Sequence, residues 1–242
     1  MSSDEEILKR VQAALETEPR IRLHQFPIRL DVAAGTVCLE GEVEDIAARR
    51  LALRVAREAA GSNELIDRLH IVPSDPRGDG EILDALEQSL LRECDLKNCT
   101  LRRGEKRRVE ILHEAVGDDS CGNILFSVAD GVITLEGHVI SLSHRRVAEV
   151  LAWWVPGCRQ VVNCLQVVPA EEDHDHELND AVRLVLELDP LVHADQIGVV
   201  TSLGVVTLQG VVPRRDERSR AELDAWYVSG IHEVINRIEV RP

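Results

Sequence analysis

The chain has 242 residues, of which 44% are hydrophobic and 29% are charged, and its formal net charge is −15. This composition is typical of a folded protein and excludes an intrinsically disordered chain, which would contain far fewer apolar residues. The acidic balance argues against nucleic-acid binding, because such proteins neutralise phosphates with a surplus of Lys and Arg. Only 2% of the residues are aromatic, so we expect small cores built from Val, Leu, Ile and Ala.

The N-terminal segment lacks the apolar stretch of a secretory signal, since Asp4, Glu5 and Glu6 come almost at once. No apolar segment is long enough to span a bilayer. We therefore expect a cytoplasmic protein, and a peripheral contact with a membrane is left open.

The first element in chain order is a predicted helix whose apolar residues recur in four-residue steps and so share one face. These residues are Ile7, Val11 and Leu15. Pro19 ends the helix. Two segments of alternating apolar residues follow, 28–32 and 37–43, and they predict a pair of strands that turn at Gly35.

A second helix is predicted to begin after Asp45, which has the position and the residue type of an N-cap. It runs to about Gly61, which has the position of a left-handed C-terminal cap. The alternating segment 66–71 then predicts a last strand. The order of elements is therefore helix, strand, strand, helix, strand.

This order recurs twice, because residues 35–73, 131–169 and 204–242 align without a gap. In each segment a second glycine follows six residues after the first, and a third follows twenty residues after the second. The second glycine lies on the inward face of the hairpin, where we expect it to leave room for a packed helix. The predicted structural glycines are Gly35, Gly41, Gly61, Gly131, Gly137, Gly157, Gly204, Gly210 and Gly230.

We therefore predict an α+β protein of three tandem αββαβ units, each with two helices packed on one face of a three-stranded mixed sheet. The predicted boundaries are 1–76, 77–169 and 170–242. We call these units the first, second and third repeats.

The hairpin Gly131–Gly137, which reads Gly-Val-Ile-Thr-Leu-Glu-Gly, and the closing strand Val161–Val167 resemble the BON domain, the bacterial OsmY and nodulation family. The resemblance covers nearly the whole chain. It implies a noncatalytic module that attaches proteins to membranes through phospholipid contact and that occurs in proteins protecting the cell envelope against osmotic stress. We expect no cofactor.

The second repeat contains about 22 additional residues, roughly 95–116. This insertion is a basic island in an acidic protein, and such a cluster could bind an anionic headgroup, a phosphate or an acidic partner. A solvated loop, or an intramolecular clasp onto the acidic third repeat, is the interpretation that we favour, because charge runs are usually solvated faces. Its candidate binding residues are Lys97, Arg102, Arg103, Lys106, Arg107 and Arg108.

Aromatic residues end the second helix of the later repeats, at Trp153 and Trp154 and at Trp226 and Tyr227. They are also candidate binding residues, since such rings can insert at a membrane interface. Packing between neighbouring repeats is the interpretation that we favour.

Six cysteines, Cys38, Cys94, Cys99, Cys121, Cys158 and Cys164, show no CxxC spacing. We expect buried thiols in a reducing compartment.

The sequence His174-Asp-His176 has residue types that suit a metal, but it matches no metal-binding spacing, and we interpret it as part of an acidic linker. No phosphate loop, nucleophile elbow or zinc pattern occurs, so we predict neither an enzyme nor a metal site.

Two functional hypotheses follow. In the first, the repeats contact anionic phospholipid or a membrane-associated protein, in osmotic or envelope stress. In the second, they form a cytoplasmic scaffold that binds a soluble protein or a second copy of the chain.

Overall fold

The computed structural model describes residues 3–105, 108–117 and 120–241. The chain divides into two compact units, residues 1–72 and 73–242. The first unit contains the first repeat, and the second unit contains the second and third repeats. Among the described residues, no helix is long and apolar enough to cross a membrane.

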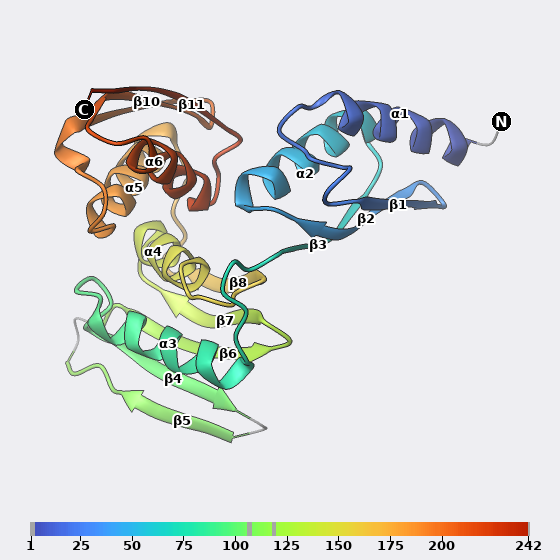
Figure 1. Cartoon of the computed structure of the whole chain (residues 1–242). Coiled ribbons are helices and arrows are strands. Elements are labelled where there is room, and N and C mark those ends of the chain that lie inside the picture. The colour runs from blue at the N-terminus through green and yellow to red at the C-terminus, as the bar shows by residue number, and fades with distance from the viewer. Residues whose placement is uncertain (1–2, 106–107, 118–119, 242) are drawn as a thin grey trace. The chain divides into compact units, whose positions relative to one another are not determined.

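The first repeat has two helices on one face of a three-stranded sheet (Figure 1). β1 pairs antiparallel with β2, and β3 returns after α2 to pair parallel with β2. Its elements are α1 (Ser3–Thr17), β1 (Ile28–Ala33), β2 (Thr36–Val43), α2 (Ile46–Ala60) and β3 (Leu65–Ile71).

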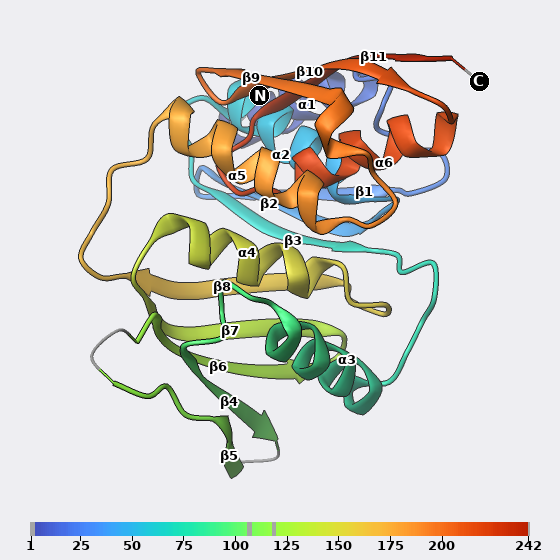
Figure 2. The ribbon, with the colours of Figure 1, turned by 90° about the vertical axis from the view of Figure 1, so that its left-hand side faces the viewer.

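The second repeat has the same plan with two more strands, so its sheet has the order β5-β4-β6-β7-β8. Figure 2 shows α3 and α4 on one face of this sheet and β5 at its edge. The elements are α3 (Asp79–Arg92), β4 (Cys99–Glu105), β5 (Arg108–His113), β6 (Gly122–Ala129), β7 (Val132–Val139), α4 (Leu142–Trp153) and β8 (Gln160–Val167).

The third repeat again has three strands, in the order β11-β10-β9. β9 is antiparallel and β11 parallel to the central β10. Its elements are α5 (Asp175–Leu188), the short 3-10 helix η1 (Ala194–Gln196), β9 (Ile197–Ser202), β10 (Val205–Val212), α6 (Arg215–Tyr227) and β11 (Glu233–Val240). The predicted fold, three tandem αββαβ units with mixed sheets, is confirmed, and the five-stranded middle sheet is the departure from it.

The predicted helix starts are confirmed where a side chain can cap them. Asp45 accepts a hydrogen bond from the backbone N–H of Ala48 at 2.8 Å, and Ser141 accepts one from His144 at 3.3 Å. The predicted helix ends are less regular. Gly61 directly follows α2, whereas Gly157 and Gly230 lie in the turns beyond α4 and α6.

The second glycine of each hairpin has a different role from the one predicted. A Cβ added to Gly137 would lie 2.1 Å from the carbonyl oxygen of Asn123, and one added to Gly210 would lie 2.0 Å from that of Gln196. Both glycines have a positive φ, +121° and +151°. They therefore make room for the backbone at the start of the neighbouring strand, and not for a packed helix.

Candidate binding sites

The insertion of the second repeat is part of the sheet and not a solvated loop. β4 pairs parallel with β6, and β5 pairs antiparallel with β4. The sequence did not predict these strands, because charged residues interrupt the alternation of apolar residues on which strand prediction depends. Lys106 and Arg107, which connect β4 to β5, lie outside the described residues.

Arg103 of β4 is clasped by acidic residues of its own repeat. Its guanidinium donates to Asp84 at 2.7 Å and to Glu87 at 2.8 Å, both on α3. The hydrogen bonds to these carboxylates raise the pKa of Arg103 above its ordinary value. A clasp therefore exists, but it closes on α3 and not on the third repeat as the sequence suggested.

The other cations of the insertion differ in their surroundings. Arg102 donates to the side-chain oxygen of Asn123 at 2.9 Å. Lys97 and Arg108 are exposed. Among the candidate cations that the structure describes, these two are thus the most accessible to an anionic partner, and their role in binding stays a prediction.

A disulfide joins Cys99, at the start of β4, to Cys121, just before β6. The predicted thiol state is therefore wrong for this pair, and a covalent bond closes the segment 99–121, which contains both strands of the insertion. Of the free cysteines, Cys158 is buried as expected, whereas Cys94 and Cys164 are exposed.

Trp153 and Tyr227, which are among the aromatic residues at the helix ends, lie where the second and third repeats meet. Trp226 of α6 is fully buried and Trp153 of α4 is nearly so. The rings of Trp153 and Tyr227 have their centroids 6.2 Å apart, a distance typical of packed aromatic pairs. Trp154 is only partly buried. This arrangement agrees with packing between repeats and leaves Trp226 without contact to solvent.

A buried arginine reinforces the same contact. Arg146 of α4 is 2% exposed and donates to both carboxylate oxygens of Asp173, at 2.6 and 2.5 Å, in the linker that leads into the third repeat. Its Nε also donates to the backbone carbonyl of Ser229, beyond α6, at 3.3 Å. One side chain thus connects the second repeat, the linker and the third repeat.

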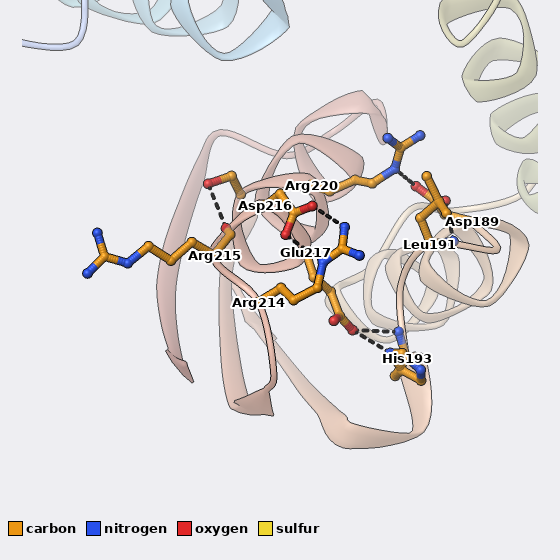
Figure 3. A network of polar contacts seen from close by, with 9 residues as sticks. Asp189, Leu191, His193, Arg214, Arg215, Asp216, Glu217 and Arg220 are labelled. Carbon is orange, nitrogen blue, oxygen red and sulfur yellow. Dashed lines mark hydrogen bonds and ion pairs between the residues drawn. The ribbon is translucent and has the colours of Figure 1, made fainter. Parts of the chain in front are cut away.

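The third repeat contains a network of buried carboxylates between α6 and the segment after α5 (Figure 3). Glu217 accepts hydrogen bonds from the backbone N–H of His193 at 2.9 Å and from its ring Nδ1 at 2.8 Å. Asp189 accepts from the backbone N–H of Leu191 at 2.9 Å and forms an ion pair with Arg220. These bonds satisfy two carboxylates that would be costly to bury alone.

Asp224 is the third buried carboxyl group of this region. Burial raises its pKa to about 8, and the neighbouring charge of Asp189 acts in the same direction. Arg220 and a hydrogen bond from Trp154 oppose this rise. The Trp154 contact comes from the second repeat, so the interface between repeats includes a titratable group. The sequence did not reveal these carboxylates, because nothing in their spacing signals burial.

The first repeat contains a groove of about 1160 Å³ between α1 and β1. Leu8, Gln12 and Glu16 line it from the helix, Ile28 and Leu30 line it from the strand, and the loop 19–27 between the two supplies most of the remaining lining. The corresponding hollow of the third repeat, between α5 and β9, has only about 190 Å³. This difference was not predicted, since the apolar residues Ile28 and Leu30 of the first repeat have apolar equivalents, Ile197 and Val199, in the third.

A family model described as the BON domain matches residues 3–73, 110–169 and 174–242. The chain belongs to the BON-domain family. The match to the middle BON repeat begins within β5, so α3 and β4 precede the matched stretch. BON domains are generally noncatalytic binding modules.

Two solved structures of CdsD, a structural protein of the type III secretion system of Chlamydia trachomatis, are similar to this chain. The C-terminal domain of CdsD has 12% sequence identity and a TM-score of 0.26, with 100% of both chains covered. The second structure has 12% identity and a TM-score of 0.25, covering 98% of this chain and 92% of that one. A comparison with the curated proteins finds no match.

Each BON repeat also shares a hydrogen bond that the sequence analysis missed. An aspartate in or near the first turn of the first helix accepts from the backbone N–H of the first hairpin glycine. Asp4 accepts from Gly35 at 3.2 Å, Asp79 from Gly131 at 2.8 Å and Asp175 from Gly204 at 3.0 Å. The two backbone N–H groups of Gly204 and Leu203 lower the pKa of Asp175. The recurrence of Asp three residues before the first apolar helix position was the available signal.

Proposed function

We propose that this chain is a noncatalytic scaffold whose BON repeats act through protein–protein contacts. The observation that carries the proposal is the packing of α4 against α5 and α6, where the buried Trp153 of the second repeat contacts the ring of Tyr227 of the third. An aromatic contact thus joins two BON repeats of this chain, and buried aromatic side chains commonly stabilise protein interfaces.

An exposed sheet edge supports the same proposal. β5 ends the five-stranded sheet, and its Val109 and Ile111 are 56% and 59% exposed. An edge strand with exposed apolar side chains is a template for pairing with another chain. The second BON repeat thus offers a second surface suited to a protein partner.

The buried carboxylates argue for binding over catalysis. Asp189, Glu217 and Asp224 have the residue type of catalytic acids and bases, but each is at most 3% exposed. A substrate could not reach them without opening the third repeat, and a catalytic group must lie within hydrogen-bond reach of its substrate. We therefore assign them to the stability of the third repeat.

Contact with anionic phospholipid is the second candidate function, in a role under osmotic or envelope stress. The exposed Lys97 and Arg108 favour it, since basic side chains near a surface bind anionic headgroups. The net charge of −15 and the acidic partners of Arg103 oppose it. The balance favours protein partners.

Two measurements on the full chain separate these candidates. Co-sedimentation with neutral and with anionic vesicles, at low and at moderate salt, should leave the protein in the supernatant. Salt-sensitive sedimentation with anionic vesicles alone would overturn the scaffold proposal in favour of phospholipid contact.

The second measurement uses a photoreactive residue in place of Ile111 on the edge strand β5. Irradiation in cells that express the chain should give discrete adducts with protein. The matched control is Leu203, which is 85% exposed but lies in a turn. Adducts at position 111 and not at 203 support edge-specific protein contact, whereas equal labelling at both positions contradicts it.

A further inference from the structure

The groove beside β1 in the first BON repeat corresponds to a position in the second repeat that a strand, β4, occupies. There, β4 lies along β6, the strand equivalent to β1, in a parallel register that runs from Cys99 opposite Gly122 to Gly104 opposite Ser127. The second repeat therefore shows what this fold accepts at that edge, which is one extended strand.

β4 fills the space between the first helix and the edge strand with two inward side chains. Leu101 is 1% exposed and lies opposite Ile124 of β6. Arg103, two residues later, lies opposite Phe126 and donates to Asp84 and Glu87 on α3. An apolar residue and a charged residue two positions later are thus the recognition elements of the added strand.

The first repeat has equivalent apolar residues on β1, but no added strand covers them. Ile124 and Phe126, under β4, are fully buried. Their equivalents in the first repeat, Ile28 and Leu30, are partly exposed and line the groove. In the third repeat the equivalent Ile197 and Val199 are buried and the hollow is small. The first repeat thus differs from both others in that the apolar residues at this position of its edge strand are partly exposed.

The backbone of β1 is suited to the same addition. β1 is the edge strand of its sheet, in the order β1-β2-β3, so the sheet pairs it on one side. A strand edge of this kind can accept the main-chain hydrogen bonds of an added peptide, while side-chain pockets provide the specificity.

We propose that the first BON repeat binds an extended segment of a partner protein, which adds to β1 as a parallel strand in the way that β4 adds to β6. The segment carries an apolar residue at the position of Leu101 and an acidic residue two positions later. This inference rests on the proposed function of a protein-binding scaffold and names the kind of segment that the scaffold recognises.

The acidic preference follows from the residues of α1 that align with the two carboxylates holding Arg103, of which Gln12 lines the groove and Lys9 is exposed. Alignment of Ile7 with Ile82 places Lys9 where the second repeat has Asp84, and Gln12 where it has Glu87. The two carboxylates that hold Arg103 are therefore replaced by one cation and one neutral amide. A carboxylate at the position of Arg103 would complement the first repeat.

The test uses two fluorescent peptides with the sequence of residues 97–105, both with Cys99→Ser and one with Arg103→Glu as well. Their binding to the full chain is measured by fluorescence anisotropy. The R103E peptide should bind saturably.

Gln12→Trp on α1, which fills the groove, should weaken binding at least about tenfold, because the peptide loses its apolar contacts. Ala13→Trp is the matched control, since Ala13 is exposed on α1 outside the groove, and binding should be unchanged.

A charge reversal tests the register. In the Lys9→Glu chain the preference should move toward the peptide that retains Arg103, by about two- to fivefold, as expected for an exposed ion pair. Equal binding of the R103E peptide to the parent and Gln12→Trp chains would overturn the groove proposal. So would the absence of binding by both peptides. Protein adducts at position 111 would then still uphold the scaffold function, whereas sedimentation with anionic vesicles would remove the scaffold function itself.

Discussion

The guanidinium of Arg146 is buried in α4, while its partner, the carboxylate of Asp173, is about half exposed, with side-chain exposures of 3% and 43%. If the pair is broken, water can therefore solvate the carboxylate but not the guanidinium. Because the pair also contacts the backbone of Ser229, it fastens the second BON repeat to the third.

Removal of Asp173 should destabilise the second unit more than removal of Arg146. Asp173→Ala leaves a buried charge without its counterion and should lower the free energy of unfolding by about 2–4 kcal/mol. Arg146→Met retains the packing of the aliphatic stem and leaves a carboxylate that water can reach, so about 1–2 kcal/mol is expected. Urea unfolding followed by tryptophan fluorescence measures both, since all three tryptophans lie in the second unit.

The surface pair Arg241 and Glu239, with side-chain exposures of 70% and 62%, provides the control. Glu239→Ala should change the stability by less than about 0.5 kcal/mol. If Arg146→Met cost more than Asp173→Ala, the asymmetry of solvation would not explain the energetics of the pair.

Gly137→Ala should destabilise the second repeat by about 2–4 kcal/mol, because its Cβ would lie 2.1 Å from the carbonyl oxygen of Asn123 and its φ is +121°. Gly80 of α3 has open space around its Cβ position, so Gly80→Ala should instead stabilise by a few tenths to about 1 kcal/mol. Thermal unfolding of the two variants and the parent chain measures both changes in stability. A neutral Gly137→Ala would mean that the hairpin tolerates a side chain at this position.

The hairpins, the helix starts and the repeats were predictable because local rules determine them. Glycine spacing, apolar alternation and the caps Asp45 and Ser141 act over a few residues. β4 was not predictable, because Arg102 and Arg103 interrupt its apolar pattern and are stabilised by Asn123 and by α3, which are distant in sequence. A strand that depends on distant partners leaves no local signal.

The candidate sites were less predictable than the fold for the same reason. Trp153 and Tyr227 were identified by residue type, but the contact between their rings depends on how two repeats pack. The carboxylates Asp189 and Asp224 look like ordinary surface residues in the sequence, and the groove of the first repeat depends on what is absent beside β1.

Loss of the disulfide between Cys99 and Cys121 should destabilise the second repeat by about 2–4 kcal/mol, because the bond closes a loop across a separation of 22 residues. Hydrogen exchange of the β4 amides should accelerate in the Cys99→Ala/Cys121→Ala chain and, equally, in the parent chain under a thiol reductant. Cys94→Ala, at an exposed free cysteine, should show neither effect. Unchanged exchange in the reduced parent would show that pairing with β6 alone holds β4.

Ionisation of Asp224 should make the third repeat less stable as the pH rises. Its pKa is raised to about 8 in the folded chain, against 3.8 ordinarily. The folded state therefore retains a proton that the unfolded state has already released between these values. The favourable contribution of this group is complete below about pH 4, decreases as the pH rises and is lost above about pH 8.

Asp224→Asn should remove this dependence. The amide cannot ionise, yet it can donate to Asp189 as the protonated carboxyl group does and accept from Trp154. The variant should therefore exceed the parent in stability at pH 8.5 by about 1–3 kcal/mol, and the difference should shrink toward pH 5. Urea unfolding at intervals between pH 5 and 8.5 measures this difference.

Asp216→Asn is the control, because Arg214 lowers the pKa of Asp216. Removal of this carboxylate should leave the slope of stability against pH unchanged in this range. A parent and an Asp224→Asn chain with parallel profiles would show that Asp224 is already ionised at neutral pH, so that Arg220 and Trp154 outweigh burial.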